Sequence, residues 1–311
     1  MFYATEHAVV VESYCNIDVD WTVYALIYLN LNQYATSTAQ PGLSVATINE
    51  VLLPVPPIDE QKRIANEIEK WFDLIKEIES GKVEFESYIK QTKSKILDLA
   101  ISGKLVPQDP NDEPAIELLK RINPGFKPCD NSHYENLPEN WCLAKVKDVF
   151  VINPRNKAED NTIAGFIPMT LIDDGYSNTF SYEKRKWEAI KTGFTHFADG
   201  DVAVAKISPC LENRKSIVLR DLPNGIGAGT TELHVFRSSV VSPEYALYFF
   251  KSEYFISRCV GTFNGVVGQQ RVGKNIIEEI QIPIPPINEQ TKIVSTIETI
   301  FTQLNTITAE L

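Results

Sequence analysis

A proline-rich segment occurs twice in this chain of 311 residues, and each copy stands just before a run of regularly spaced apolar residues. The segment "PVPPIDEQKRI" begins at Pro54 and "PIPPINEQTKI" begins at Pro283, an offset of 229 positions. An internal repeat of this kind constrains the fold, because each copy should build the same local structure. The sequence therefore predicts one structural unit that is present twice.

The repeat continues upstream of the proline-rich segments, with weaker similarity. The segment "YALIYL" at Tyr24 resembles "YALYFF" at Tyr245, and "TEHAVV" at Thr5 resembles "TELHVF" at Thr231. These matches are offset by 221 and 226 positions, so the register slips by a few residues. By this register, whatever precedes Thr231 in the second copy has no counterpart before Met1, and we expect the first copy to be incomplete.

After each proline-rich segment, apolar residues alternate at spacings of four and three, the heptad pattern of a helix that packs against another helix. This pattern predicts a long helix over 57–103, with Gly81 as a weak point, and a second helix over 287–311. Two such helices in one chain most simply pair antiparallel; the alternative is that each packs only on its own domain. The predicted seam consists of Ile64, Ile68, Trp71, Ile75, Ile78, Ile89, Ile96, Ile293, Ile297, Ile300, Leu304 and Ile307.

The net charge of −11 excludes a class of function only if the acidic residues lie in the part of the chain that would perform it. Residues 137–286 carry 17 Lys and Arg and 17 Asp and Glu, so the excess negative charge belongs to the rest of the chain. This balance permits DNA binding by 137–286 but predicts no broad basic face. Five scattered cysteines without a CxxC pair indicate reduced thiols, and no apolar run approaches the roughly 18 residues of a membrane span. We expect a cytoplasmic protein without membrane contact.

Short β-rich runs divided by Asn, Gly, Pro and Asp indicate a globular α+β domain over 137–286. These runs are "VKDVFVI", "DVAVAKI", "KSIVLR" and "ELHVFRSS", and one helical stretch follows them, "SPEYALYFFKSEYFISRCV". Residues 104–136 form a linker with a short helix over 114–122. The expected fold class is α+β: a remnant of a first domain over 1–56, including strand-like "HAVVVES", and a complete second domain, joined by long antiparallel coiled-coil helices.

Several segments, in order, resemble the DNA-specificity subunit of Type I restriction–modification systems. They are "GKLVPQDPNDEPAIELLKRI", "LPENW", "GDVAVAKISPCLENRK", "GAGTTELHVFR", "GTFNGVVGQQRV" and "IPIPPINEQTKI". The resemblance covers the chain from about Thr5 to Leu311. It implies two target-recognition domains that alternate with two long helices, each domain reading one half of a bipartite DNA site. It also implies helices that set the distance between the halves and dock two adenine-N6 methyltransferase subunits, and a motor-nuclease subunit that cuts unmethylated DNA.

The resemblance implies a subunit without a catalytic centre, cofactor or metal; its partner subunits would use S-adenosylmethionine, ATP and Mg. The sequence agrees, since it contains neither an N-P-P-[FY] methyltransferase motif nor GxxxxGK[ST], and its four histidines form no metal-binding cluster. The departure from the family is the incomplete first recognition domain. It fits a truncated gene product, a half-subunit that needs a partner chain, or an expressed fragment. We expect only the second domain to read DNA, and a second copy of this chain is a further candidate partner.

Three stretches of the second domain combine residue types that contact phosphates and base edges. The stretch "YEKRKWEAIK" is either a basic cluster around an aromatic residue or a solvated face with the tryptophan turned inward. In "AKISPCLENRK" we favour DNA contact for Lys206 and Arg214; the alternative is a buried turn. "GTFNGVVGQQRVGK" has glycines that permit close backbone approach, or is a loop pinned internally by Gln270 and Arg271. The predicted DNA-binding residues are Lys184, Arg185, Trp187, Lys206, Ser208, Asn213, Arg214, Lys215, Asn264, Gln269, Gln270, Arg271 and Lys274.

Two other classes of function compete with a DNA-reading subunit. A structural adaptor would dock methyltransferase subunits through its helices and no longer read DNA. An enzyme, either a nuclease or a methyltransferase in its own right, is disfavoured by the missing motifs. His196 and His234 each stand beside apolar residues, which is typical of structural histidines rather than metal ligands.

Overall fold

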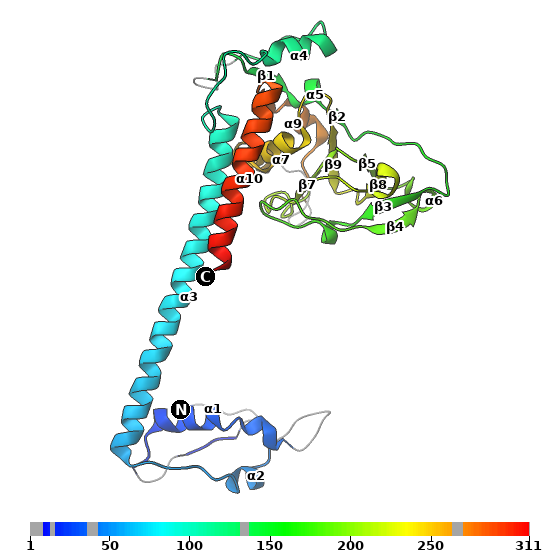
Figure 1. Cartoon of the computed structure of the whole chain (residues 1–311). Helices are drawn as coiled ribbons and strands as arrows, with labels where there is room; N and C mark the ends of the chain where they lie inside the picture. Colours follow the sequence, from blue (N-terminus) through cyan, green and yellow to red (C-terminus); the bar gives the residue numbers. More distant parts are fainter. Residues whose placement is uncertain (1–8, 13–15, 36–42, 131–136, 263–269, 311) are drawn as a thin grey trace. The chain divides into compact units, whose positions relative to one another are not determined.

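The computed structural model of the chain describes residues 9–12, 16–35, 43–130, 137–262 and 270–310. The chain divides into two compact units, Met1–Phe85 and Glu86–Leu311. The boundary falls inside one helix, α3 (Ile58–Ile101), which contributes its first part to one unit and its last part to the other (Figure 1). Helices and sheets are both present, and the fold class is α+β, as the sequence predicted.

Helix α3 has 44 residues, which corresponds to a length of about 65 Å. Pro56 and Pro57 precede it, and Asp59 and Glu60 lie in its first turn, where carboxylates favour the positive end of the helix dipole. The helix continues through Gly81 without a break. The helix preference of its neighbours therefore outweighs the cost of one glycine, roughly 1 kcal/mol.

The first unit contains three short helical elements in addition to the start of α3. They are α1 (Val19–Tyr28), the 3-10 turn η1 (Leu31–Tyr34) and α2 (Val45–Asn49). Of the strand-like segment "HAVVVES", residues 9–12 form no strand, and the remaining residues lie outside those described. The first unit, as described, is therefore helical.

A glutamine fixes the junction between α1, the proline-rich segment and α3 in the first unit. Asp18 caps α1, and its backbone N–H donates to Gln61 Oε1 at 2.8 Å. Gln61 Nε2 donates in turn to the Pro56 carbonyl at 2.7 Å. The rings of Tyr24 and Phe72 lie 5.9 Å apart, which places α1 beside the first turns of α3.

The second unit contains the same junction. Ser242 caps α7 (Pro243–Lys251), and its backbone N–H donates to Gln290 Oε1 at 2.7 Å. Gln290 Nε2 donates to the Pro285 carbonyl at 3.1 Å, and the rings of Tyr248 and Phe301 lie 6.0 Å apart. The matching bonds show that this junction occurs in both units.

The matching bonds also correct the alignment of the two copies. Asp18 and Ser242 have the same role, which sets the offset of the capped helices at 224 positions. Tyr24 therefore corresponds to Tyr248, rather than to Tyr245 as the sequence indicated. A shift of three residues is close to one helical turn, so the apolar stripes of the two helices match almost equally well in either register.

The second unit contains one two-stranded and two four-stranded sheets among its described residues. One four-stranded sheet is antiparallel, in the order β2 (Val151–Ile152), β9 (Leu233–Arg237), β6 (Val202–Ala205), β7 (Ser216–Val218). The other has the order β4 (Glu183–Lys186), β3 (Ile163–Ile167), β8 (Ile226–Gly229), β5 (Thr195–Ala198), with β3 and β8 parallel. The two-stranded sheet pairs β1 (Cys142–Lys145) antiparallel with β10 (Gln281–Ile284). This last pairing joins the two ends of the globular domain, which the sequence placed at 137–286.

Besides the end of α3, the second unit contains several helices and 3-10 turns. These elements are α4 (Ala115–Ile122), α5 (Val146–Val149), η2 (Met169–Leu171), α6 (Trp187–Ile190), η3 (Pro223–Gly225), α7, α8 (Glu253–Val260), α9 (Lys274–Glu279) and α10 (Ile287–Ala309). They differ from the sequence prediction at two places. The stretch predicted as one helix breaks at Ser252, whose hydroxyl caps α8 by accepting from Phe255 N. The run "VKDVFVI" begins as α5 instead of a strand, because Val146 and Val149, three positions apart, are both buried on one face.

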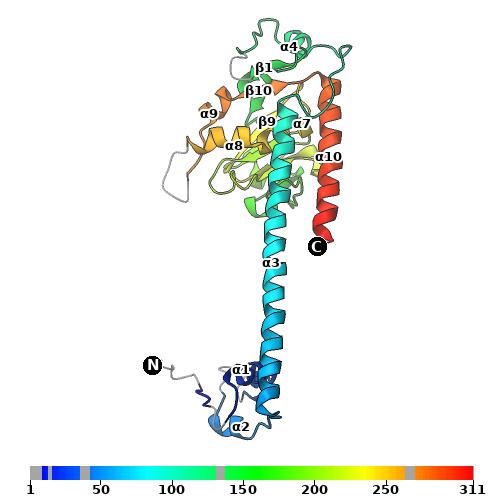
Figure 2. The same cartoon turned by 90° about the vertical axis from the view of Figure 1, so that its left-hand side faces the viewer.

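The last turns of α3 pack antiparallel against α10 (Figures 1 and 2). Lys93 Nζ contacts Asn305 Oδ1 at 2.5 Å and lies 5.6 Å from the centre of the Phe301 ring. Asp112, beyond the end of α3, pairs at 3.3 Å with Lys292 near the start of α10. The contacts run in opposite directions along the two helices, so the predicted antiparallel arrangement is confirmed at this end.

The predicted seam is formed only over this end of α3. Ile96, Ile293 and Ile297 are buried in one core, whereas Ile89, Ile300 and Leu304 are half-buried. In the first unit, Trp71, Ile75 and Ile78 are 60, 46 and 71% exposed, Ile64 is 36% exposed and Ile68 is half-buried; at the end of α10, Ile307 is 46% exposed. The seam positions of the first unit are therefore more exposed than those that pack against α10. The reason is length, because α10 has 23 residues against 44 in α3.

Candidate nucleic-acid interface

Two of the three predicted DNA-binding stretches run side by side in the second unit. Val272 N donates to the Lys206 carbonyl, and Ser208 N donates to the Gln270 carbonyl, both at 2.9 Å. A β-bridge joins Arg271 to the residue that follows Lys206. The structure thus brings together Lys206 and Arg271, which lie 65 positions apart in the sequence.

Glu232 orients Arg271 and places a negative charge near Lys206. Two guanidinium nitrogens of Arg271 contact the two carboxylate oxygens of Glu232 at 2.7 Å each, while 45% of the arginine side chain stays exposed. These hydrogen bonds lower the pKa of Glu232, which keeps it ionised. Burial lowers the pKa of Lys206, and the charge of Glu232 acts in the opposite direction. The result is an arginine held in one orientation beside a half-buried lysine.

A hollow of about 330 Å³ adjoins this cluster, at the ends of strands from both four-stranded sheets. It is lined by Asn153, Pro154, Arg155, Gly193, Phe194, Thr195, His196, Lys206, Thr231 and Leu233. Of these, sequence reasoning selected only Lys206 as a contact residue. The segment "INPRN" carried the missed signal, since a turn with Asn, Pro and Arg follows strand β2 there.

The positive charge of the hollow comes from Arg155 and Lys206. His196 lies 3.3 Å from Arg155 Nη1, and burial lowers the pKa of this histidine, which is therefore neutral at pH 7. Burial also lowers the pKa of His234 to about 4, and its Nε2 donates to the Val272 carbonyl at 3.1 Å. Both histidines act as hydrogen-bonding groups of the fold, as the sequence indicated.

The first predicted stretch lies on β4, at the edge of its sheet. Lys184 is exposed, whereas Arg185 covers the Phe166 ring at 3.8 Å and pairs with Glu183 at 2.6 Å. Trp187 is only 2% exposed and packs in the core. The prediction that Trp187 contacts DNA is wrong, and the alternative of an inward tryptophan is confirmed. The physical reason is that Trp187 starts α6, which packs over β3 and β8.

Arg214 and Lys215 hold the fold together instead of facing a ligand. The Arg214 side chain is 9% exposed, donates to the Lys251 carbonyl at 3.0 Å and pairs with Glu253 at 2.7 Å. Lys215 Nζ donates to the Ile172 carbonyl at 2.8 Å. These contacts correct the prediction for both residues in favour of the buried turn.

The other predicted residues occupy mixed positions. Ser208 Oγ donates to Glu212 at 2.6 Å, Asn213 is exposed, and the exposed Lys274 lies 3.3 Å from Glu278 one turn further along α9. Asn264 and Gln269 lie outside the described residues. The structure therefore gathers Lys206, Ser208, Gln270 and Arg271, and it leaves Lys184 on a separate edge.

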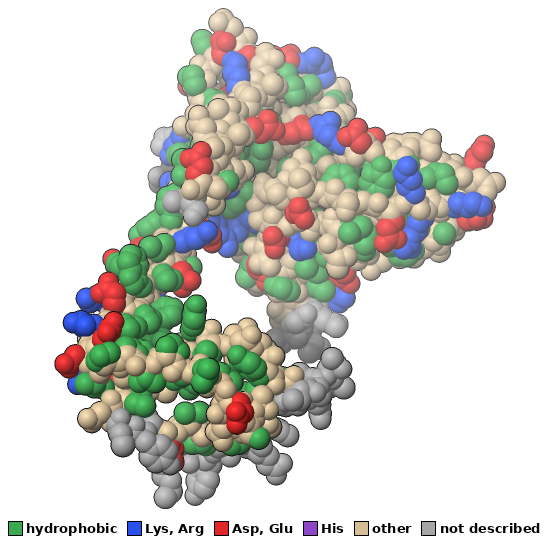
Figure 3. All heavy atoms as spheres, turned by 60° about the horizontal axis from the view of Figure 1, so that its bottom comes forward, with side chains coloured by type: hydrophobic (Ala, Val, Ile, Leu, Met, Phe, Trp, Pro, Cys, Tyr) green, Lys and Arg blue, Asp and Glu red, His purple; other side chains and the backbone are tan. Residues whose placement is uncertain are grey.

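Charges of both signs alternate on the face of the second unit that is visible in Figure 3, as its balanced composition predicted. Within the described ranges, no group of three His, Cys, Asp or Glu could hold a metal ion. None of the helices described combines the length and the apolar composition that a membrane span requires. The candidate interface is a small polar surface on an α+β domain.

The fold is that of HsdS subunits. A crystal structure of the HsdS subunit from Thermoanaerobacter tengcongensis matches with a TM-score of 0.51 at 15% identity, over 94% of this chain and 64% of that one. A chain from a study of complex assembly and conformational transition of the type I R-M system matches with a TM-score of 0.55 at 15% identity, over 94% and 63%. A family model, Type I restriction modification DNA specificity domain, matches residues 1–84 and 138–311, and the chain belongs to this family.

Sequence relatives from Escherichia coli agree with this family. The chain is 40% identical to the Type I restriction enzyme EcoEI specificity subunit over 236 residues, which is 70% of this chain and 40% of the relative. It is 39% identical to the EcoAI specificity subunit over 259 residues, 75% of this chain and 44% of the relative. The chain thus spans less than half the length of these curated relatives.

Proposed function

We propose that this chain is the sequence-specific DNA-binding component of a Type I restriction–modification complex. Its second unit would contact double-stranded DNA through Lys206, Arg271 and the adjoining hollow. The observation that carries this proposal is the convergence of the two stretches on one polar surface in a chain of the specificity family.

The residue types of this surface are suited to two different kinds of DNA contact, one to a base edge and one to a phosphate. An arginine fork held in one orientation is suited to the O6 and N7 acceptors of guanine, and a lysine is suited to a phosphate. The hollow lies at strand ends, where loops carry recognition residues on a rigid scaffold. Arg155 extends the cationic surface, and Lys184 and Lys274 would add phosphate contacts.

The proposed partners are adenine methyltransferase subunits and a motor-nuclease subunit. These would supply the chemistry with S-adenosylmethionine, ATP and Mg, while this chain itself would contribute no catalytic step and act in the cytoplasm. The exposed apolar side chains of α3 at Trp71, Ile75 and Ile78 support a docking role for this helix, because a monomer seldom leaves such a stripe uncovered.

The test is co-expression of the chain with its methyltransferase subunit and genome-wide mapping of N6-methyladenine. The wild type should methylate a defined motif, and Arg271→Ala should relax one position of it, at a cost of about 1–3 kcal/mol in discrimination. Glu232→Gln breaks the same ion pair but keeps the arginine, so it separates recognition from stability. Lys120→Ala, an exposed lysine on α4, is the matched control.

Three outcomes decide between the candidates. If Arg271→Ala leaves the motif unchanged, Arg271 serves the fold alone. If the wild type methylates no motif yet still binds the methyltransferase, the chain is an adaptor. A palindromic motif with a fixed gap would show that two copies of this chain act together, and an asymmetric motif would exclude that arrangement.

A further inference from the structure

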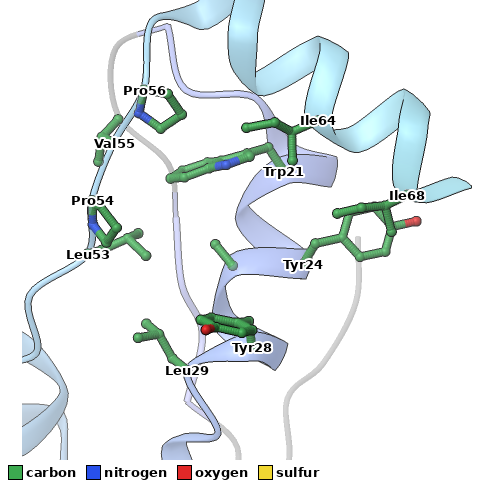
Figure 4. Close-up of a pocket in the computed structure, with 11 residues that line it drawn as sticks. Trp21, Tyr24, Tyr28, Leu29, Leu53, Pro54, Val55, Pro56, Ile64 and Ile68 are labelled. Carbon is green, nitrogen blue, oxygen red and sulfur yellow. The ribbon is translucent and has the colours of Figure 1, made fainter.

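An apolar groove in the first unit and the hollow beside Lys206 in the second unit have opposite chemical character. The groove, of about 640 Å³, is surrounded by hydrophobic side chains such as Trp21, Tyr28 and Ile64 (Figure 4). The hollow, of about 330 Å³, is lined by the two cations Arg155 and Lys206, and its described lining includes no aspartate or glutamate. The hollow therefore concentrates positive charge in a domain whose charges are balanced overall.

The ammonium group of Lys206 lacks a hydrogen-bond partner within the described ranges, although the side chain is half-buried. Glu232 is the carboxylate whose charge acts on it, but both oxygens of Glu232 are bound to Arg271. A partly buried cation is costly to keep without a hydrogen-bonding partner. An anion in the hollow would supply that partner.

Arg155 provides the second cation, and most of its guanidinium is available. Its Nη1 donates to the Phe194 carbonyl at 3.3 Å. His196 is not an acceptor for it, because Nδ1 of this histidine accepts from the Asn156 backbone N–H at 3.2 Å, and Nε2 donates to the Lys191 carbonyl at 2.9 Å. The Nε–Nη2 edge of the guanidinium thus has no partner among the described residues, and such an edge can bind two phosphate oxygens at once.

The remaining polar groups of the hollow favour a phosphate over a base edge. The hydroxyls of Thr195 and Thr231 line it without a hydrogen-bond partner in the described part of the chain, and a hydroxyl can donate to a phosphate oxygen. The amide of Asn153, which could otherwise read an adenine edge, is already engaged. Its Oδ1 accepts from Val235 N at 3.0 Å, and its Nδ2 lies 3.2 Å from Nδ1 of His234.

We propose that the hollow binds one phosphate of the DNA backbone, held jointly by Arg155 and Lys206, and that it reads no base. This inference rests on the proposed function and deepens it. Phosphate contacts fix the register of a protein on a duplex, whereas base contacts carry the sequence. The hollow would therefore set the position of the duplex, and the neighbouring Arg271 would read one base from that position.

The test uses two labelled duplexes of equal length, one with the methylated motif and one with that motif scrambled. Each is titrated with the complex of this chain and its methyltransferase subunit and followed by anisotropy. Arg155→Ala and Lys206→Ala should each weaken binding about tenfold, by the same factor on both duplexes. Arg271→Ala should weaken binding to the motif duplex alone. Lys120→Ala, which removes the same charge from the exposed face of α4, is the matched control and should have no effect.

The salt dependence tests whether the two cations share one phosphate. Binding constants are measured between about 50 and about 200 mM NaCl, where each lost phosphate contact lowers the slope of log K against log salt by about 0.9. The double variant of Arg155→Ala and Lys206→Ala should lose about 0.9, since one phosphate is released. A loss of about 1.8 would mean two separate phosphates and would overturn the joint site.

Circular dichroism should show that the variants fold, because Arg155 is exposed and the Lys206 ammonium has no hydrogen bond to lose. Unchanged affinity and slope in Arg155→Ala, with the wild-type motif still methylated, would overturn the inference and leave the proposed function standing. A loss on the motif duplex alone would show that Arg155 reads a base, so that the assignment of a phosphate is wrong.

Inorganic phosphate, titrated by calorimetry into the same complex, separates the two sources of this ligand. Arg155-dependent binding of inorganic phosphate by a wild type that binds neither duplex would assign the hollow to a free phosphate. In that case both the DNA-backbone site and the proposed function would be wrong.

Discussion

The two junctions of this protein share their polar framework and differ in their surroundings. Gln61 and Gln290 each receive a hydrogen bond from a capping residue and donate one to a proline carbonyl. Yet Ile293 is completely buried, while its counterpart Ile64 is 36% exposed. A local hydrogen-bond pattern therefore specifies the shape of a junction, and segments far away in the sequence decide its burial.

The largest difference should appear on truncating the seam isoleucines. Ile297→Ala opens a cavity in a packed core and should cost about 3 kcal/mol, whereas Ile68→Ala, at a half-buried site, should cost less than about 1 kcal/mol. Denaturant unfolding with hydrogen-exchange protection, read separately for each unit, measures both. Equal losses would show that the first junction is covered as fully as the second.

Removal of the shared glutamines should give similar losses in both units. Gln61→Ala and Gln290→Ala each leave the backbone N–H of a half-buried capping residue without its acceptor, at a cost of about 1 kcal/mol or more. The loss at Gln290 should be the larger, because its Nε2 also lies 3.3 Å from the Val240 carbonyl. Hydrogen exchange of the Asp18 and Ser242 amides reports each bond directly. A negligible effect at Gln61 alone would break the equivalence of the junctions.

The capped helices α1 and α7 differ in a way that should make the stability of the second unit depend on pH. Lys251 is fully buried, whereas its counterpart Ile27 is 69% exposed. Burial lowers the pKa of Lys251 to about 7 from an unfolded value near 10.5. Between these values the unfolded chain binds more protons, so stability should rise with pH above about 7, by up to about 1.4 kcal/mol per pH unit.

The measurement for Lys251 is the free energy of unfolding of the second unit at pH 7, 8 and 9. In Lys251→Met this slope should flatten, although the absolute stability also falls because the ammonium bonds to the Gly175 and Arg214 carbonyls are lost. An unchanged slope in the variant would assign the pH dependence to other groups.

The smallest effect concerns Trp141, which lies just before β1 and packs over the junction of the second unit. Trp141→Phe keeps an aromatic ring, although a smaller one, but removes the donor to Glu289, and should cost about 1 kcal/mol or somewhat more in the second unit. The first unit should be unaffected, because Glu60 is exposed and Trp141 belongs to the other unit. Thermal unfolding and local hydrogen exchange test this pair of expectations. A change of protection around Glu60 would contradict them.

The sequence predicted periodic elements well and contacts poorly. Heptad spacing placed α3 and α10 within two residues of their observed ends, since helical period is a local property. Lys206 and Arg271 were chosen with Arg214 and Trp187 on residue type and on the family resemblance of their stretches. Exposure separates them, because Arg214 meets Lys251 and Glu253 across the fold while Arg271 stays at the surface. Arg155 was missed because its neighbours in the hollow come from distant strands.

The sequence alone determined the repeat, the long helices, the α+β class and the resemblance to specificity subunits, all of which depend on local spacing or on motifs in order. Only the tertiary structure decided which copy of the junction is covered, which cations face solvent, and where α10 meets α3. The physical reason is that burial is set by segments that meet across the fold, as β1 and β10 do over a separation of more than a hundred residues. Spacing along the chain carries no information about such meetings.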